Sequence, residues 1–349
     1  MTIIILIIML SLIICIHEFG HFITAKKSGV YVDEFSMGMG PILFKYKPKN
    51  SETRYCIRAF PIGGFVSMAE KYDPENKKIG KNRTLENKSF IKQFIVFIAG
   101  IFMNCVLAIV LFFISGLIYG MPVEEPIVDA VVEGKPAALA GIEAGDRILK
   151  VNGTNIKTWD DFLLEASGKK GKDSYIITVS KANGDVKEYD VVPEIEIIQK
   201  QEVRRFGIQS VGVEYHKGFV NALKYGFVGF YDTSRTILKI LGSLFTGEVS
   251  LKSLSGPVGI YSVVDTVKTQ GLEMIIYLTA YLSINVAIMN LLPVPVFDGG
   301  RILLLIIEKI SGHKKSEKTE LIINYIGFGL LVLLMIYVTF NDVIKLVVK

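Results

Sequence analysis

Residues 3–24 read IIILIIMLSLIICIHEFGHFIT, an apolar run long enough to cross a bilayer, and His17, Glu18 and His21 lie within it. Side chains four positions apart lie on one face of a helix, so the two imidazoles of this HEFGH motif can bind one metal ion. The Glu between them is the usual general base toward water at such a metal. Because charged and metal-binding groups are costly in a bilayer, the stretch indicates metal-dependent hydrolysis within or at the edge of a membrane.

The composition bounds the class of protein. Half of the 349 residues are hydrophobic and the mean hydropathy is +0.43, which predicts membrane spans plus at least one soluble domain. The net charge of +5 is spread over loops without forming a basic helix, so no nucleic-acid partner is expected. The cysteines, Cys15, Cys56 and Cys105, are an odd and scattered set, which argues against a disulfide framework and against a cysteine-ligated zinc.

Hydropathy and charge divide the chain into alternating spans and polar segments. We expect a first span carrying the motif (1–24), a polar loop (25–93), a second span (94–119), a soluble domain (127–193), a linker with an amphipathic helix (194–270), a third span (271–300), a loop (301–320) and a fourth span (321–345). The loops 25–93 and 301–320 are basic, so the positive-inside rule places both in the cytoplasm. A multi-pass protein of the cell membrane follows, with both termini and the soluble domain extracytoplasmic. We do not expect a cleaved signal peptide.

Two polar segments carry β-strand patterns. The loop 25–93 contains FSMGMGPILF (35–44) and RAFPIGGFVSM (58–68), which predict short strands that turn at their glycines, or an ordinary hairpin on the membrane surface. Residues 127–193 alternate β-rich runs with turns, and ANGD (182–185) predicts a hairpin.

The soluble segment also carries a longer motif, and a helical pattern follows it. The stretch KPAALAGIEAGDRILKVNG (135–153) resembles the core of a PDZ domain, whose open sheet edge takes up an extended peptide; any small β-rich domain is the alternative. Residues 219–247 suit a helix at the membrane interface, or equally one packed on the spans.

Asp298 is the best candidate for a third metal ligand, since a catalytic zinc takes three protein ligands and keeps one position open. His216 and His313 lie in polar segments and suit solvated surface positions better. Asp298 lies in NLLPVPVFDGGR (290–301), where two prolines cannot continue a regular helix. On its own it would be expected to cap the next helix. Because the first and third spans run in the same direction, their C-terminal ends can meet, and beside the His pair the ligand role is favoured.

These motifs resemble the site-2-type intramembrane zinc metalloproteases, in the bacterial branch like the regulator-of-sigma-E protease with one PDZ domain. The resemblance covers nearly the whole chain: HEFGH, the glycine-rich β region, an AGxxxN segment (Ala99, Gly100, Asn104), the PDZ-like stretch, SGPVGI (255–260) and NLLPVPVFDGG, in family order. It implies a polytopic α-helical membrane protein of about four transmembrane helices, with an inserted β-rich PDZ domain and a membrane-associated β region. The sequence departs from the family pattern at Phe297, where Leu is typical, and at Ile101, where Pro is common.

The resemblance also implies roles for individual residues. Zn2+ would be held by His17, His21 and Asp298, and Glu18 would activate the water. Asn290 would position the substrate or the oxyanion, and Asn285 would touch substrate. The glycine-rich stretches would correspond to a membrane re-entrant loop and a substrate-clamping strand, which assigns substrate binding to Gly38, Gly40, Gly63 and Gly64. The implied partners are single-pass membrane protein substrates, a peptide or substrate segment at the PDZ groove, and the lipid bilayer.

The implied reaction is hydrolysis of peptide bonds within single-pass transmembrane substrates, such as pre-trimmed anti-sigma factors or signal-peptide remnants. A membrane-anchored zinc protease acting on soluble chains is one alternative, and it requires a third ligand in a soluble segment. A non-catalytic PDZ membrane scaffold is the other, and it requires a degenerate metal site. The intact HExxH and DGG motifs favour the intramembrane protease.

Overall fold

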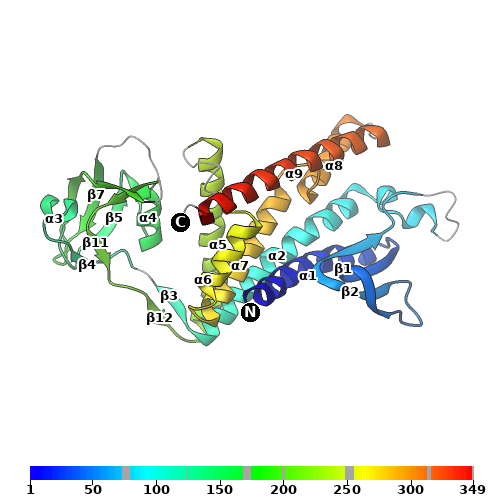
Figure 1. The fold of residues 1–349 in the computed structure, drawn as a ribbon, viewed down its shortest axis with the longest axis horizontal. Helices are drawn as coiled ribbons and strands as arrows, with labels where there is room; N and C mark the ends of the chain where they lie inside the picture. Colours follow the sequence, from blue (N-terminus) through cyan, green and yellow to red (C-terminus); the bar gives the residue numbers. More distant parts are fainter. Residues whose placement is uncertain are drawn as a thin grey trace. The chain divides into compact units, whose positions relative to one another are not determined.

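The computed structural model describes residues 1–72, 79–123, 125–167, 174–198, 201–247, 255–312 and 316–347 (Figure 1). The chain forms two compact units. Unit 1 comprises Met1–Ser115, Ala222–Ile240 and Ser250–Lys349, and unit 2 comprises Gly116–Asn221 and Leu241–Val249. His313, Lys314 and Lys315, which the sequence places in the loop 301–320, lie outside the described residues.

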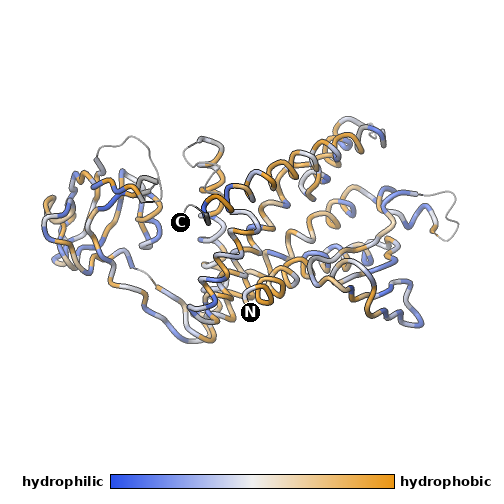
Figure 2. The backbone as a smooth tube through the Cα atoms, in the orientation of Figure 1, coloured by the Kyte–Doolittle hydropathy of each residue, from blue (hydrophilic) through white to orange (hydrophobic). Residues whose placement is uncertain are grey.

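Unit 1 is built mainly from helices, some of which suit a membrane. Its helical elements are α1 (Thr2–Lys27), α2 (Phe90–Ile118), α5 (Phe219–Phe245), α6 (Pro257–Val267), α7 (Leu272–Leu291), α8 (Asp298–Ser311) and α9 (Glu317–Val347). By length and composition, α1, α2, α7 and the Leu321–Lys345 part of α9 can cross a membrane, and their traces are largely apolar in Figure 2. These helices correspond to the four spans that the sequence predicts.

The third span ends earlier than the sequence predicts. α7 stops at Leu291, and Leu292 is extended with a ψ of 143°. The reason is Pro293, because the residue before a proline is driven out of the helical region and the proline has no amide to donate. Helix resumes at Asp298, so much of the predicted loop 301–320 is in fact α8, which buries Ile302 and Leu305 on one face.

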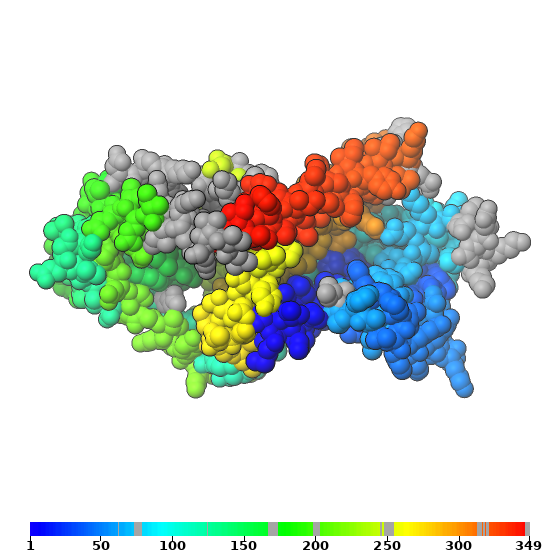
Figure 3. All heavy atoms as spheres, viewed as in Figure 1, coloured from blue at the N-terminus to red at the C-terminus, as the bar shows by residue number. Residues whose placement is uncertain are grey.

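The predicted linker 194–270 is largely structured. It contains strands that belong to unit 2, and its α6 packs in unit 1 around a cluster formed by Met9, Val264, Val267 and Leu278. Figure 3 shows α6, in yellow, directly against the N-terminal part of α1, in blue. The backbone amides of Gly256 and Gly259, at the start of α6, both donate to the Asp342 carboxylate over 2.8 Å. The SGPVGI stretch therefore joins α6 to α9.

The amphipathic segment 219–247 forms α5, which packs on α2. A Cβ at Gly226 would lie 3.1 Å from the Ile109 carbonyl oxygen, and one at Gly229 would lie 3.0 Å from the Phe112 ring. These glycines let the two helices approach closely. Of the two placements that the sequence allows, the structure shows the helix packed on a span.

The glycine-rich region forms one sheet from two long, bent strands, β1 (Val32–Tyr46) and β2 (Arg54–Met68). Residues 34–37 pair with β2 on two sides, so Phe35 lies opposite both Val66 and Tyr55. Gly38, Gly40 and Gly63 take φ values of 84°, 84° and 85°, which other residues rarely adopt. The glycines therefore bend continuous strands rather than separate short ones, and the sheet is more than an ordinary hairpin.

Unit 2 is a β-rich domain with two short helices. Its elements are β3 (Met121–Val123), β4 (Val128–Val131), α3 (Pro136–Ala140), β5 (Arg147–Val151), β6 (Thr154–Asn155), α4 (Trp159–Ser167), β7 (Tyr175–Ser180), β8 (Val186–Val191), β9 (Glu194–Ile198), β10 (Gln201–Arg205), β11 (Ile208–Ser210) and β12 (Glu214–His216). One sheet has the order β6-β5-β7-β8, and the predicted ANGD hairpin joins β7 to β8.

The soluble unit extends beyond the predicted boundaries 127–193. β11 returns to pair with β4, and β12 pairs with β3. Phe206, just before β11, is 5% exposed and packs against Tyr175 in the core. The sequence signal for these strands is weak because each is short and largely exposed.

Candidate metal centre

α1 places two imidazoles on one buried face. His17 and His21 are 8% and 7% exposed, and their Nε2 atoms lie 3.2 Å apart. One helical turn separates the two residues, which is why both rings reach the same point.

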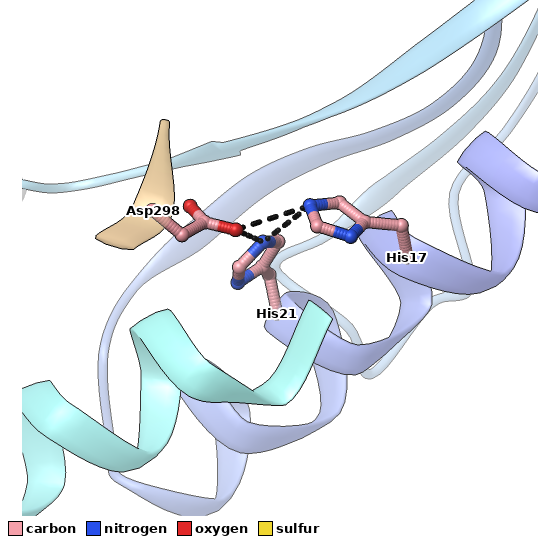
Figure 4. A group of neighbouring side chains, drawn as sticks. All are labelled: His17, His21 and Asp298. Atoms are coloured by element: carbon pink, nitrogen blue, oxygen red, sulfur yellow. Dashed lines mark hydrogen bonds and ion pairs between the residues drawn. The ribbon is translucent and has the colours of Figure 1, made fainter. Parts of the chain in front are cut away.

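Asp298 reaches the same point from the turn between α7 and α8. Its Oδ2 lies 3.2 Å from the Nε2 of His17 and 3.2 Å from the Nε2 of His21 (Figure 4). This oxygen is buried and receives no hydrogen bond from the described residues. Asp298 is the first residue of α8, and the N-cap of that helix, Phe297, makes no side-chain cap. The carboxylate is therefore directed at the imidazoles.

The glycines after Asp298 make its turn possible. A Cβ at Gly299 would lie 2.3 Å from the Leu291 carbonyl oxygen, and one at Gly300 would lie 2.2 Å from that of Val294. No side chain fits at these distances, so only glycine allows α8 to start this close to the end of α7. The DGG motif is thus explained by packing as well as by the carboxylate.

α2 supports the two imidazoles from behind. The Nδ1 of His21 lies 2.7 Å from the Val96 carbonyl oxygen, and the Nδ1 of His17 lies 3.4 Å from the Asn104 side-chain amide. Between these contacts is Gly100, where a Cβ would lie 2.5 Å from the His21 Nε2. The carbonyl of Val96 had no signal in the sequence, because any residue type supplies a carbonyl. Gly100 and Asn104 belong to the AGxxxN segment, which gave them no role of their own.

Glu18 lies beside β2, on the helical turn that carries the His pair. It is partly buried, and the backbone of Val66 in β2 lies near its carboxylate. A Cβ at Gly64 would lie 3.9 Å from the Glu18 Cγ. The strand that contains Gly63 and Gly64 therefore runs next to the candidate general base.

The other predicted site residues are not drawn into the cluster. Asn285 donates to the Tyr281 carbonyl within α7, and Asn290 is half-buried in the last turn of that helix. Gly38 and Gly40 lie in the bend of β1, against Phe60 of β2. His216 is exposed on β12 in unit 2. The structure thus gathers His17, His21 and Asp298, whose three candidate ligand atoms lie within 4.8 Å of one another.

Comparison with known proteins identifies the family. The model of Peptidase family M50 matches residues 5–334, which is most of the chain. The chain belongs to peptidase family M50. Its relatives within M50 include zinc metalloprotease RasP of Bacillus licheniformis, 31% identical with 99% of each chain covered, and zinc metalloprotease RasP of Oceanobacillus iheyensis, also 31% identical with 99% of each covered. The regulator of sigma-W protease RasP of Bacillus subtilis is 30% identical, again with 99% of each chain covered.

The M50 assignment confirms part of what the sequence predicts. The chain is a site-2-type zinc metalloprotease, and its cofactor is Zn2+. Together with the four candidate spans, the family makes it a multi-pass membrane protein. The individual ligands, the substrate and the PDZ domain remain predictions.

Proposed function

We propose that this M50 protein hydrolyses peptide bonds within single-pass membrane proteins, with zinc held by His17, His21 and Asp298. The observation that carries the proposal is the triangle of two Nε2 atoms and one Oδ2 atom with sides of 3.2 Å. Nitrogen and oxygen ligands about 2.0 Å from a tetrahedral zinc are separated by about 3.3 Å, so the three atoms have the spacing that zinc requires. Among the described residues, the buried Asp298 Oδ2 also receives no hydrogen bond, as a metal ligand would.

The place of the cluster in the chain supports hydrolysis inside the bilayer. Both imidazoles project from α1, a helix apolar enough to span the membrane, and Asp298 lies seven residues beyond the end of α7, another candidate span. A third ligand in a soluble segment would be needed for a protease restricted to soluble chains. The proposed third ligand, Asp298, instead follows the end of a span, which supports the intramembrane protease over this alternative.

The roles proposed for the protein groups in the reaction rest on their positions and on the family resemblance. Zinc supplies a Lewis acid that polarises the scissile carbonyl and makes water more acidic. Glu18 accepts the proton from the attacking water and delivers it to the leaving amine. The Val66 backbone beside the Glu18 carboxylate helps to hold it in place for this exchange. Asn290, at the end of α7, contacts the substrate or its oxyanion, and Asn285 one turn earlier touches the substrate.

We further propose that the bent sheet holds the substrate. A helix in lipid has all its amides paired, so the scissile segment must unwind before attack. The strand around Gly63 and Gly64 runs beside Glu18, which suits pairing with an extended substrate segment. Gly38 and Gly40 bend β1 and thereby shape the same sheet. The name of the Bacillus subtilis relative refers to sigma-W regulation, which favours a pre-trimmed anti-sigma factor as the substrate class.

Unit 2 is proposed to be a PDZ domain outside the cytoplasm that binds a peptide or a substrate segment and filters substrates by size. Its β-rich core and the KPAALAGIEAGDRILKVNG stretch support this assignment. Because Met121 pairs with His216, residues 121–216 can be replaced by a short linker with little strain. The replacement should increase cleavage of untrimmed substrate, and an unchanged rate would contradict the filter.

The proposed topology can be tested separately in intact cells. In a background without Cys15, Cys56 and Cys105, a membrane-impermeant maleimide should label Asp185→Cys in unit 2 and should not label Lys49→Cys between β1 and β2. Both positions are exposed. The opposite labelling pattern would place unit 2 in the cytoplasm and overturn the orientation.

The activity is tested with the purified full chain in detergent and a single-span reporter. We expect cleavage within the span by the wild type and none by Glu18→Gln at equal zinc content. Glu214→Gln, the same change on an exposed side chain of unit 2, should cleave like the wild type. Cleavage that persists in Glu18→Gln would remove Glu18 from the reaction. Undiminished zinc binding by His17→Ala would show that zinc is held elsewhere.

A further inference from the structure

The two imidazoles at the metal centre each have one nitrogen turned toward α2. For His21 the partner of Nδ1 is the Val96 carbonyl oxygen at 2.7 Å. A carbonyl only accepts hydrogen bonds, so Nδ1 of His21 carries the proton and its Nε2 keeps a free lone pair. The neighbouring backbone therefore fixes the tautomer that a metal requires at Nε2.

His17 has a different partner at the corresponding position. Its Nδ1 lies 3.4 Å from Nδ2 of Asn104, a residue with no exposed surface. The Oδ1 of that amide is buried and has no hydrogen-bond partner among the residues that the structure describes. The nitrogen and oxygen of an amide have nearly the same shape, so either orientation fits the same space. With Nδ2 facing the imidazole, the amide donates to Nδ1, which forces the proton of His17 onto Nε2. That proton would face Asp298 and occupy the lone pair needed for a metal.

The opposite amide orientation resolves this conflict. With Oδ1 facing the ring, the amide accepts the proton of Nδ1, and Nε2 of His17 is left free beside that of His21. Rotating the Asn104 amide in this way also gives its Oδ1 a hydrogen-bond partner, the Nδ1 of His17. One face of α2 carries Val96, Gly100 and Asn104, which are spaced four residues apart. This spacing places a hydrogen-bond acceptor opposite each imidazole, and Gly100 between the two acceptors leaves room for the rings. Figure 4 shows α2, in cyan, near His21.

The backbone of Asn104 is held independently of its side chain. Ser283 of α7 donates to the Asn104 carbonyl oxygen over 2.9 Å, and both residues have no exposed surface. This contact fixes α2 against α7 at the level of the metal centre. With the backbone held in this way, the main motion left to the Asn104 side chain is rotation of its amide group.

Resting on the zinc site proposed above, we propose that Asn104 is a positioning residue for His17. Its Oδ1 accepts the Nδ1 proton, so that Nε2 is presented to zinc in the correct tautomer and orientation. The Val96 carbonyl performs the same role for His21. Asn104 thus belongs to the metal centre although it is not a ligand.

The test measures zinc affinity of the full chain in detergent by competition with a chelator. Asn104→Ala removes the acceptor and should weaken zinc binding roughly 10- to 100-fold. Asn104→Asp still accepts the Nδ1 proton and should bind zinc at least as tightly as the wild type. Ser283→Ala removes the α2–α7 hydrogen bond without changing the His17 contact, so its affinity should be unchanged.

The outcomes separate this proposal from the zinc site on which it rests. If His17→Ala binds zinc like the wild type, the ligand set itself is wrong. If His17→Ala loses zinc but Asn104→Ala does not, only the role of Asn104 is overturned. Weak binding by both Asn104→Ala and Asn104→Asp would mean that the amide donates instead of accepting.

A second measurement serves in case Asn104→Asp does not fold. Zinc binding raises the melting temperature of the wild type, and at a given zinc concentration the rise is larger when the folded state binds zinc more tightly. Asn104→Ala should show a smaller zinc-dependent rise than Ser283→Ala. The proposal would be overturned if zinc raised the melting temperatures of Asn104→Ala and Ser283→Ala equally while both variants melted at lower temperatures than the wild type without zinc. Asn104 would then have only a structural role.

Discussion

Gly100 of α2 offers the sharpest test of how the metal centre is packed. A Cβ added there would lie 2.5 Å from the His21 Nε2 and 2.6 Å from the His17 Cε1, whereas ordinary contacts begin at 3.4 Å. Gly100→Ala therefore has to displace the imidazoles, or α2 itself, by about 0.9 Å. Metal sites tolerate deviations of only about 0.2 Å in ligand distance. We expect zinc affinity to fall at least ~100-fold, which corresponds to about 2.8 kcal/mol.

The assay is chelator competition on the purified full chain, with melting of the zinc-free protein followed in parallel. Alanine favours a helix over glycine by about 1 kcal/mol, so a loss of zinc does not come from a weaker helix. Gly329→Ala is the matched control, because a Cβ at that position of α9 meets nothing within 4 Å. It should bind zinc like the wild type. Zinc affinity of Gly100→Ala within a factor of about two of the wild type would refute the packing argument.

Three further predictions concern buried charges. Lys181→Met removes the ammonium group that lies 2.9 Å from the Asp146 carboxylate, which is 1% exposed. The unpaired carboxylate should destabilise unit 2 by about 3 kcal/mol. Fluorescence of Trp159, the single tryptophan, reports this unfolding. Burial lowers the pKa of Lys181, but hydrogen bonds, chiefly to Asp146, raise it more. Its stabilising effect is therefore full below the unfolded pKa of about 10.4 and is lost as pH rises through the higher folded pKa. Asp342→Ala removes the acceptor of two amides at the start of α6 and should cost about 3 kcal/mol in thermal unfolding of the full chain.

Each of these predictions has a control in the chain. Lys187→Met changes an exposed lysine of β8 and should leave the Trp159 transition in place. A difference between wild type and Lys181→Met that already declines below about pH 9 would contradict the sign of the pKa shift. Asp342→Asn keeps an oxygen acceptor and should lose less than Asp342→Ala. Equal losses in the two Asp342 variants would mean that the amides do not depend on this acceptor.

Much of the geometry of the candidate metal centre was predictable because its parts follow from simple rules. The i, i+4 spacing fixes the two imidazoles on one face, and the common direction of the first and third spans lets Asp298 reach the same end of the helices. The structure places these three side chains together as the pattern suggests. The support from α2 was not predictable, since a backbone carbonyl such as that of Val96 leaves no trace in the residue types.

The errors in the fold have equally specific causes. The hydropathy pattern predicted a third span that extends to residue 300. Hydropathy does not include the backbone effect of Pro293, which forces Leu292 out of the helix. Strands β9–β12 were assigned to a linker because short, exposed strands lack a hydrophobic period. Among the residues from β9 to β12 whose burial is described, only Phe206 is buried. The double pairing of residues 34–37 depends on contacts between distant residues, which a local pattern does not contain.

The separation of the cluster along the chain has a consequence for biosynthesis. Asp298 follows His21 by 277 positions, and Gly100 and Asn104 of α2 come between them. A ribosome must therefore complete α1, α2 and α7 before the last of the three side chains emerges. A chain interrupted before that point lacks the carboxylate, so truncated products cannot assemble the proposed zinc site. Because Asp298 is the last of the three residues to be synthesised, the activity depends on completion of the fold.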